Sequence, residues 1–200
     1  EGPRVIELGC GGAQFGLALA QQGAEVTGVD ISGAQLAHAR ELADEHGTAI
    51  ELIESSVTDL PLPDAAYDLA VSAFAFQWVP DLRACFEEAH RVLAEGGRLV
   101  FSVDHPLYRC LDPETGEFAT SYFDDSPRRE HSETLDAELV VYRRTVGDIV
   151  NALLDAGFTV GRLHEPGYED PEAYDSTFGS FEPDRMARVP PTLVVAAHKR

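Results

Sequence analysis

Near its start, the chain reads as an apolar strand, a glycine-rich turn, a helix and a second apolar strand that ends on an acid. Residues 4–8 form the first apolar run, residues 9–12 the turn, and residues 24–30 the second run, which ends at Asp30. Glycines let the backbone approach a ligand closely, and the following helix presents unpaired N–H groups at its N-terminus. An acid at the end of the second strand can accept hydrogen bonds from ribose hydroxyls. The run therefore predicts a βαβ unit that binds a ligand containing adenosine.

The glycine turn departs from the pattern that binds dinucleotides. That pattern is G-x-G-x-x-G; Gly9 and Gly11 fit it, but Gln14 occupies the third position. Glu7 stands two residues before the first glycine, where a carboxylate would repel a pyrophosphate and attract a cationic ligand. S-adenosylmethionine (SAM) carries a sulfonium, an ammonium group and a ribose, and it has no phosphate. These residues favour SAM over NAD.

Four motifs, in order along residues 4–103, resemble those of class I SAM-dependent methyltransferases of the type 11 and type 25 kinds. The first motif contains the glycine turn, and the second contains the acid at the end of the second strand. The third precedes and includes the start of the fourth strand, and the fourth leads into the fifth strand. The matching segments are residues 7–12, residues 29–32, residues 59–63 with 67–71, and residues 91–100. The resemblance implies an enzyme that uses SAM as its cofactor.

The resemblance also implies which residues contact the cofactor. The methionine half of SAM would lie on the glycine turn, Asp30 would accept both ribose hydroxyls, and Ile31 would pack on the adenine. The family's acid before the third motif is missing, so Ser56 and the backbone N–H of Val57 are expected to meet the adenine. Ala73, at the end of the fourth strand, would lie beside the methionine end of SAM, with its backbone close to the cofactor. The expected cofactor-binding set is Glu7, Gly9, Cys10, Gly11, Asp30, Ile31, Ser56, Val57 and Ala73.

Candidates for the acceptor side follow the fourth and fifth strands. Residues 76–81, with Trp78, resemble a stretch of methyltransferases that esterify small carboxylic acids. His105 follows the fifth strand, at the edge where open α/β sheets bind ligands. Because histidine exchanges protons near neutral pH, His105 is the candidate for general base or substrate positioning. The expected acceptor-binding residues are Trp78, Tyr108, Tyr122 and Arg143, the last as a partner for an acidic substrate.

Three of the acceptor-side candidates also have a structural interpretation. Trp78 could serve as core packing, since an indole ring buries a large area. His105 could be a loop histidine that satisfies backbone groups, and Arg143 could form a salt bridge at a strand end. The sequence leaves both interpretations open for each residue.

The alternation of apolar runs with helical patterns predicts an α/β fold. Strands are expected over residues 4–8, 24–30, 49–54, 67–73 and 97–103, and again over 138–144, 158–163 and 192–198. Helices are expected over 14–22, from the Ser32 N-cap with Gln35 as a capping box to residue 47, over 81–94, and from the Thr145 cap with Asp148 to 156. Strands that alternate with helices predict a parallel sheet with right-handed crossovers.

The expected fold is a Rossmann-like, mostly parallel seven-stranded sheet with helices on both faces and, as the family implies, an antiparallel last strand. One domain over residues 1–200 would comprise a cofactor-binding half (1–103), an insertion or lid (104–144) and a C-terminal helix with a strand hairpin (145–200). Residues 104–137 show no periodicity and are expected to be irregular, and residues 166–188 would form a second loop over the site. The family's helical segment before the first strand is expected to be missing here, because the chain starts at Glu1.

The charge balance restricts the partners. The net charge is −20, from 35 acids against 15 bases, and Lys199 is the only lysine. Acids spread along the chain favour adaptation of the surface to high salt, as in halophiles; an acidic face for a basic partner is the alternative. Nucleic-acid binding is disfavoured because phosphates require clustered Lys and Arg.

Cysteines and apolar stretches indicate a cytoplasmic setting. Cys10, Cys85 and Cys110 have neither metal-like spacing nor an even number, which predicts reduced thiols and no metal site. The sequence has no apolar stretch long enough to cross a membrane.

The predicted function is methyl transfer from SAM to the O, N or C atom of a small molecule, a carboxylate being one candidate. The alternatives are a non-catalytic SAM-binding module and an NAD-dependent oxidoreductase; the oligomeric state stays open.

Overall fold

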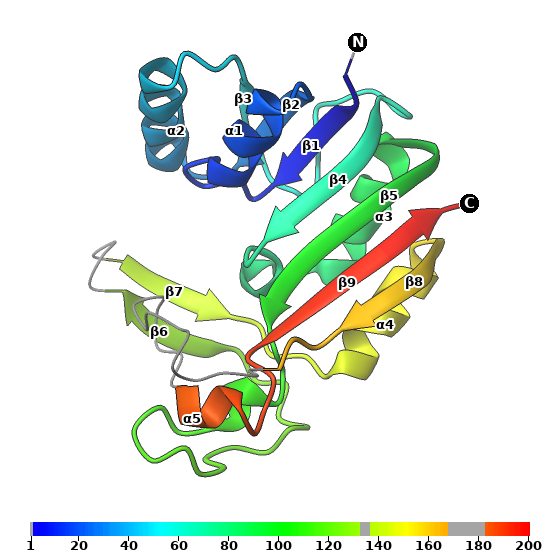
Figure 1. The fold of residues 1–200 in the computed structure, drawn as a ribbon. Coiled ribbons are helices and arrows are strands. Elements are labelled where there is room, and N and C mark those ends of the chain that lie inside the picture. Colours follow the sequence, from blue (N-terminus) through cyan, green and yellow to red (C-terminus); the bar gives the residue numbers. More distant parts are fainter. Residues whose placement is uncertain (1, 133–136, 168–182) are drawn as a thin grey trace.

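A seven-stranded sheet in the order β3-β2-β1-β4-β5-β9-β8 runs through the molecule (Figure 1). The computed structural model describes residues 2–132, 137–167 and 183–200. β9 is antiparallel to both β5 and β8, and the pairs among β1 to β5 are parallel. The expected mixed sheet with an antiparallel last strand is therefore confirmed. The strands are β1 Arg4–Leu8, β2 Glu25–Asp30, β3 Glu51–Glu54, β4 Tyr67–Ala73, β5 Leu93–Asp104, β8 Phe158–His164 and β9 Thr192–Lys199.

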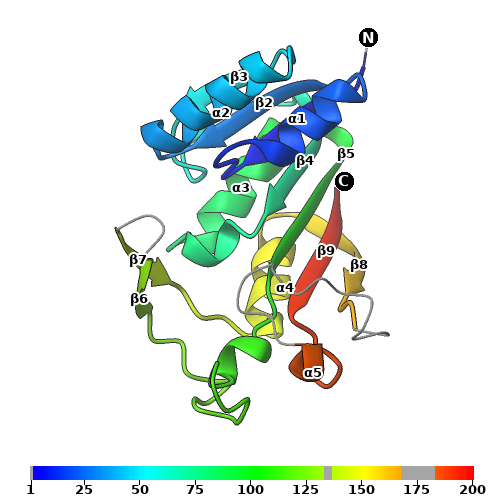
Figure 2. The same cartoon turned by 60° about the vertical axis from the view of Figure 1, so that its left-hand side comes forward.

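Helices cover both faces of this sheet (Figures 1 and 2). α1 (Gln14–Gln21) and α2 (Gly33–Glu45) lie on one face, and α3 (Leu82–Val92) and α4 (Val146–Asp155) lie on the other. The larger core fills the space beneath α3 and α4. Its centre is a trio of fully buried rings, Phe76, Phe86 and Phe101, whose centroids lie 5.1–5.5 Å apart. This cluster fixes the short helix η1 (Phe76–Trp78) just beyond the carboxyl end of β4.

Side-chain caps fix the starts of two helices near the site. At α4, Thr145 Oγ1 accepts from the Asp148 N–H (3.1 Å), and Asp148 Oδ2 accepts from the Thr145 N–H (2.8 Å), so the expected capping box is present. At α2, Ser32 Oγ accepts from the Gln35 N–H (3.3 Å). The second hydrogen bond of the expected capping box, from the Ser32 N–H to the Gln35 side chain, is not formed. The Ser32 N–H donates to Asp30 Oδ1 instead (2.9 Å).

The Thr145 cap gives a measurable contribution to stability. We expect Thr145→Ala to lower the free energy of unfolding by about 1 kcal/mol, because the Asp148 N–H loses its acceptor at the first turn of α4. Chemical denaturation measures this change. Thr145→Ser, which keeps the hydroxyl that accepts from the Asp148 N–H, is the matched control, and an unchanged stability of Thr145→Ala would contradict the role of the cap.

The insertion after β5 is more regular than the sequence indicates. It contains a short helix, η2 (Tyr108–Cys110), and a separate two-stranded sheet of β6 (Arg128–Ser132) and β7 (Ala137–Val141). The expectation of an irregular 104–137 stretch was therefore wrong for β6, whose polar residues on both faces give no apolar alternation. The strand expected to reach Arg144 ends at Val141, and β5 begins at Leu93 rather than at residue 97. Of the loop expected over 166–188, residues 168–182 lie outside the described residues; its described part includes α5 (Pro183–Met186).

The described ranges contain no helix with the length and apolar character needed to cross a membrane.

The single lysine is part of the fold: Lys199 Nζ donates to the carbonyl oxygens of His90 and Leu93, both at 2.7 Å, at the C-terminal end of α3. It thereby joins the end of β9 to the start of β5.

Candidate cofactor and acceptor sites

The turn after β1 is built from glycines in a left-handed conformation. Gly9 has φ +69° and Gly11 has φ +52°, values that side-chain-bearing residues rarely adopt. The N–H of Gly9 donates to the Val29 carbonyl (2.8 Å). A Cβ at Gly9 would overlap the Cβ of Ala75, in the loop after β4. The glycine therefore lets the β1 and β4 loops touch, and they form the floor of one cavity.

Asp30 ties the glycine turn to the start of α2. Its Oδ2 accepts from the Gly11 N–H (2.8 Å), and its Oδ1 accepts from the Ser32 N–H (2.9 Å). A carboxylate oxygen has more than one lone-pair site, so each can accept a further hydrogen bond from a ligand hydroxyl. The backbone contacts therefore hold the carboxylate in a fixed orientation at the cavity wall.

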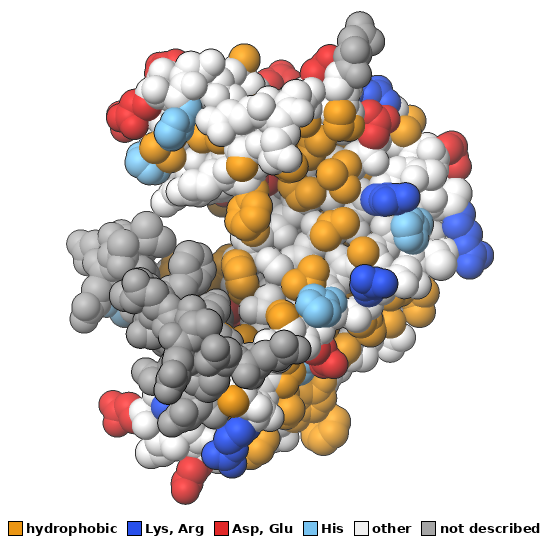
Figure 3. Space-filling view, in the orientation of Figure 1, with side chains coloured by type: hydrophobic (Ala, Val, Ile, Leu, Met, Phe, Trp, Pro, Cys, Tyr) orange, Lys and Arg blue, Asp and Glu red, His pale blue; other side chains and the backbone are white. Residues whose placement is uncertain are grey.

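A cavity of about 530 Å³ opens at the carboxyl ends of β1, β2 and β4. Its size is that of a small-molecule or cofactor site. In the space-filling view the surface is hollowed next to the end of the molecule formed by α1 and α2 (Figure 3). The lining residues are Gly9, Gly11, Asp30, Ile31, Gln35, Ser55, Ser56, Val57, Thr58, Ala73, Phe74, Ala75, Trp78, Val79, Pro80 and Leu139. All expected cofactor residues except Glu7 and Cys10 are among them.

Glu7 and Cys10 lie behind the glycine turn rather than in the cavity lining. The Glu7 side chain is 2% exposed, and its Oε2 accepts from the Gly16 N–H on α1 (2.8 Å). Burial raises the pKa of Glu7 to about 7, with a smaller contribution from the Asp30 charge. Cys10 packs into the small core beneath α2, and burial raises the pKa of its thiol to about 12. Its side chain is therefore a packing group, and its backbone shapes the turn.

Trp78 holds a strained turn beside the cavity. Phe74 has φ +53°, an uncommon conformation for a residue with a side chain. Its N–H donates to the Ser102 carbonyl (2.9 Å), and its carbonyl accepts from Trp78 Nε1 (3.0 Å). Residues in strained conformations persist where their surroundings hold them and cluster at functional sites. Trp78 thus does more than pack: it fixes the backbone that lines the cavity.

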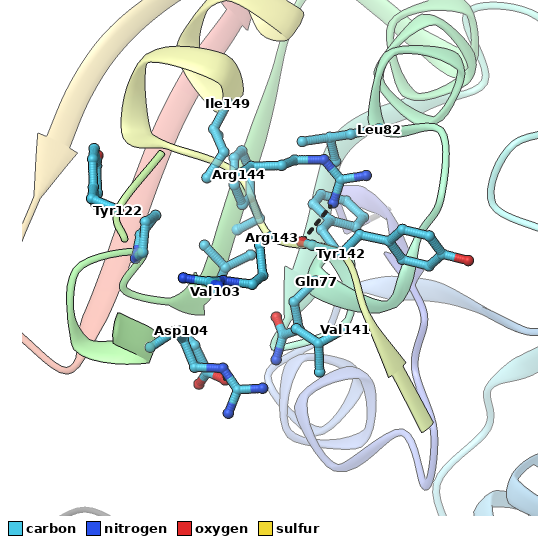
Figure 4. A pocket seen from close by; sticks show the side chains of 14 residues that line it. Gln77, Leu82, Val103, Asp104, Tyr122, Val141, Tyr142, Arg143, Arg144 and Ile149 are labelled. Carbon is cyan, nitrogen blue, oxygen red and sulfur yellow. Dashed lines mark hydrogen bonds and ion pairs between the residues drawn. The ribbon is translucent and has the colours of Figure 1, made fainter. Parts of the chain in front are cut away.

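A second, smaller cavity of about 40 Å³ lies beside η1 and the end of β5 (Figure 4). It has room for about one or a few water-sized groups. Its residues come from η1, β5, the insertion and the segment that joins β7 to α4. They are Phe76, Gln77, Leu82, Phe101, Val103, Asp104, Pro106, Arg109, Tyr122, Val141, Tyr142, Arg143, Arg144 and Ile149. Tyr122 and Arg143, two of the expected acceptor residues, are therefore brought together here.

The Arg143 side chain already forms hydrogen bonds with residues of the insertion after β5. Its guanidinium donates to Asp124 Oδ2 (2.8 Å), to Thr120 Oγ1 (2.8 Å) and to the Ser121 carbonyl (2.9 Å). The ion pair with Asp124 matches the structural interpretation of this arginine. A role for Arg143 in binding an acidic substrate stays a prediction.

His105 and Tyr108 are buried and line neither cavity. His105 Nδ1 accepts from the Leu107 N–H (3.1 Å), and Nε2 lies 2.8 Å from Glu165 Oε1. Because the backbone N–H donates to Nδ1, the proton of the neutral ring is on Nε2. Both ring nitrogens therefore have protein partners, and the general-base role of His105 stays a prediction. Glu165 was missed by sequence reasoning, since it lies 60 residues away on the segment after β8.

Sequence reasoning also missed Gln35 and Leu139, which line the larger cavity. Gln35 could have been found from its position, because α2 starts three residues after Asp30 and its first turn faces the glycine turn. Leu139 belongs to β7, and no local pattern shows that this strand reaches the cavity. Among the described residues, no group of His, Cys, Asp and Glu is placed to hold a metal ion.

The larger cavity fits SAM by its chemistry. Asp30 is the only charged side chain among the described residues that line it, which suits a cationic ligand and disfavours a pyrophosphate. Asp30 can accept from a ribose diol, and Ile31 and Val57 offer apolar surface for an adenine. The side-chain-free backbone of Gly9 and Gly11 leaves room for a methionine chain.

Comparison with known proteins agrees with this site. The family described as "Methyltransferase domain" matches residues 6–101. A crystal structure of a SAM-dependent methyltransferase from Mesorhizobium loti is similar, with 30% identity, 99% of this chain and 91% of that chain covered, and a TM-score of 0.82.

Two curated relatives match shorter parts. Demethylmenaquinone methyltransferase of Thermus thermophilus is 38% identical over 99 residues, 48% of this chain and 45% of its own length. Malonyl-[acyl-carrier protein] O-methyltransferase of Serratia marcescens is 35% identical over 101 residues, 50% of this chain and 38% of its own length. This chain thus spans less than half the length of each of these two. By its fold, its cavity and the Mesorhizobium relative, the chain belongs to the SAM-dependent methyltransferases of the methyltransferase-domain family, and SAM is its cofactor.

Proposed function

We propose that this methyltransferase acts on a small molecule that binds beside η1, at the carboxyl ends of β4 and β5. The observation that supports this is the pair of cavities on either side of η1, one of cofactor size and one that suits a small polar group. The two relatives named above act on different acceptors, so the shared half of the fold does not determine the acceptor. Its identity depends on the residues after β4 and β5.

In this proposal the chain acts mainly by positioning. When bound, SAM supplies an electrophilic methyl group on its sulfonium. Asp30 orients the ribose, Ile31 and Val57 flank the adenine, and the Phe74 loop held by Trp78 places the methionine end. Holding two reactants in line and excluding water supplies much of the rate acceleration in such a transfer. An acceptor that reacts only after losing a proton needs a base. His105 would fill that role only after its ring leaves Glu165 and the proton on Nε2 moves to Nδ1, which requires the contact of Nδ1 with the Leu107 N–H to break.

Trp78 offers a direct test of cofactor binding, because it is the only tryptophan in the chain and lines the larger cavity. Titration with SAM, S-adenosylhomocysteine and NADH should change its fluorescence with the first two and not with NADH. Screening hydroxyl, carboxylate and amine compounds for S-adenosylhomocysteine release then identifies the acceptor class. A response to NADH alone would contradict the assigned roles of Glu7 and the glycine turn.

The clamp between Trp78 and Phe74 gives a second prediction. We expect Trp78→Phe to weaken SAM binding by about 3- to 10-fold, because the Phe74 carbonyl loses the indole N–H that holds the strained turn. Calorimetry measures this, since the variant has no tryptophan. Phe118→Leu, which changes an exposed aromatic residue outside both cavities, is the control. Equal affinities of Trp78→Phe and the wild type would show that the indole N–H is dispensable.

A further inference from the structure

The smaller cavity contains a buried hydrogen-bond acceptor without a donor. Gln77 Oε1 has no hydrogen-bond partner among the described residues and is shielded from solvent. The backbone of Gln77 is fixed, because its carbonyl accepts from the Tyr142 N–H (2.9 Å). A buried polar atom without a partner is costly and is usually explained by a bound water or ligand. The amide therefore points to an occupant that donates a hydrogen bond.

The charges around the cavity limit the nature of that occupant. Arg109 lies 3.6 Å from Asp104, and Arg143 lies 2.8 Å from Asp124. Arg144 donates to two backbone carbonyls, those of Val79 (2.6 Å) and Pro80 (2.9 Å). An ammonium group would face three guanidinium groups. A carboxylate would face Asp104 and the Gln77 oxygen, while two of the three arginines already pair with carboxylates. An uncharged hydroxyl avoids both conflicts.

The cavity is placed to hold one end of the methyl acceptor. Figure 4 shows Gln77 and Asp104 entering it from η1 and from the end of β5. The two cavities share no lining residue, yet residues 73–75 and 78–80 line the larger one and residues 76–77 line the smaller one. A molecule that reaches from one to the other passes η1. A group held at Gln77 therefore anchors the acceptor at a distance from the reacting atom.

We propose that this cavity is an anchoring subsite for an uncharged hydroxyl group of the methyl acceptor, which donates its hydrogen bond to Gln77 Oε1. The apolar neighbours Phe76, Val103 and Val141 take the adjoining carbon chain. This inference rests on the proposed function, because it assigns the acceptor of the same site. It makes Gln77 a specificity-determining residue rather than a catalytic one.

The test uses three probes with the same carbon chain: 1-propanol, propionate and propylammonium. Each is titrated into protein saturated with S-adenosylhomocysteine, while ligand-observed NMR measures affinity and ¹⁵N spectra follow the Gln77 side-chain amide. We expect 1-propanol to bind most tightly and to shift the Gln77 amide signals. Tighter binding of propionate or propylammonium would overturn the hydroxyl assignment. Absence of binding by all three would show that the cavity holds water only and would overturn the subsite.

Two variants separate a binding role from a structural one. Gln77→Met keeps the length of the side chain but removes the oxygen, and it should weaken 1-propanol binding by about 3- to 10-fold. Gln77→Glu keeps an acceptor oxygen and should retain the preference for 1-propanol. Gln22→Met, on the exposed end of α1, is the matched control. Loss of affinity in Gln22→Met as well, or none in Gln77→Met, would contradict the proposal.

Trp78 fluorescence in the same samples distinguishes the two proposals. If S-adenosylhomocysteine does not bind, the proposed function fails, and the titration of the ligand-free protein still decides whether Gln77 binds a hydroxyl. If the cofactor product binds and no probe does, only the subsite fails.

Discussion

Asp30→Ala should lower the affinity for SAM by at least about 10- to 100-fold, because even one hydrogen bond to a charged group contributes about 1.5–3 kcal/mol. The carboxylate lines the larger cavity, and the N–H groups of Gly11 and Ser32 hold it in place. Its alanine replacement removes the acceptor proposed for the ribose diol and the only charge among the described lining residues. S-adenosylhomocysteine contains the same ribose, so its affinity should fall by a similar factor.

Calorimetric titration with both ligands measures this loss. Asp30→Ala also leaves the Gly11 N–H without its acceptor, so a melting curve must accompany each titration to show that the variant is folded at the temperature used. Glu54→Ala is the matched control, because Glu54 pairs with Asp30 in register on the neighbouring strand and does not line the cavity. Unchanged affinity in a folded Asp30→Ala protein would refute the ribose role.

The cofactor half of the molecule could be predicted from the sequence because its signals are local. The glycine turn, the acid at the end of β2 and the apolar runs of β1 and β4 each lie within a few residues of the groups they position. Parallel strands bring their carboxyl ends to one edge of the sheet. Knowing the strands therefore placed Gly9, Asp30 and Ala73 around one cavity without any knowledge of long-range contacts.

The acceptor half could not be predicted in the same way, because its contacts join distant residues. His105 meets Glu165 across 60 positions, and Arg144 meets the carbonyls of Val79 and Pro80 across 65 and 64 positions. β6 is polar on both faces and gives no periodic signal. A buried amide such as Gln77 resembles any surface glutamine in a sequence, and only its surroundings show that its oxygen lacks a donor.

Glu7 should make the stability of the protein decrease as the pH rises from about 4.5 to about 7. Burial raises the pKa of Glu7 from its ordinary 4.5 to about 7 in the folded chain. Between these values the unfolded chain releases the proton of Glu7 and the folded chain keeps it, so the unfolded state gains stability with pH. At ~1.4 kcal/mol per pH unit, the effect amounts to at most about 3 kcal/mol above pH 7. It is absent below pH 4.5, where both states are protonated.

Glu7→Gln removes this titration and provides the measurement. A glutamine oxygen can still accept from the Gly16 N–H, so the variant should be more stable than the wild type by up to about 3 kcal/mol at pH 8 and by less than about 1 kcal/mol at pH 5. Denaturant unfolding across this range gives both values. Glu25→Gln, an exposed acid at the start of β2, is the control. Parallel pH profiles of Glu7→Gln and the wild type would disprove the raised pKa.

If an uncharged glutamine is more stable at this position, the carboxylate must have a use that stability does not explain. Glu7 lies directly behind the glycine turn, on which the cationic half of SAM is proposed to lie, and a positive charge there favours the ionised form of Glu7. SAM affinity of the wild type should therefore increase between pH 6 and pH 8, as Glu7 ionises, whereas the affinity of Glu7→Gln should be lower at pH 8 and nearly constant with pH. Calorimetry at the two pH values decides between these outcomes. Equal affinities at pH 8 would mean that the charge of Glu7 does not act on the cofactor, and the binding energy would then have to come from Asp30 and the backbone of the turn.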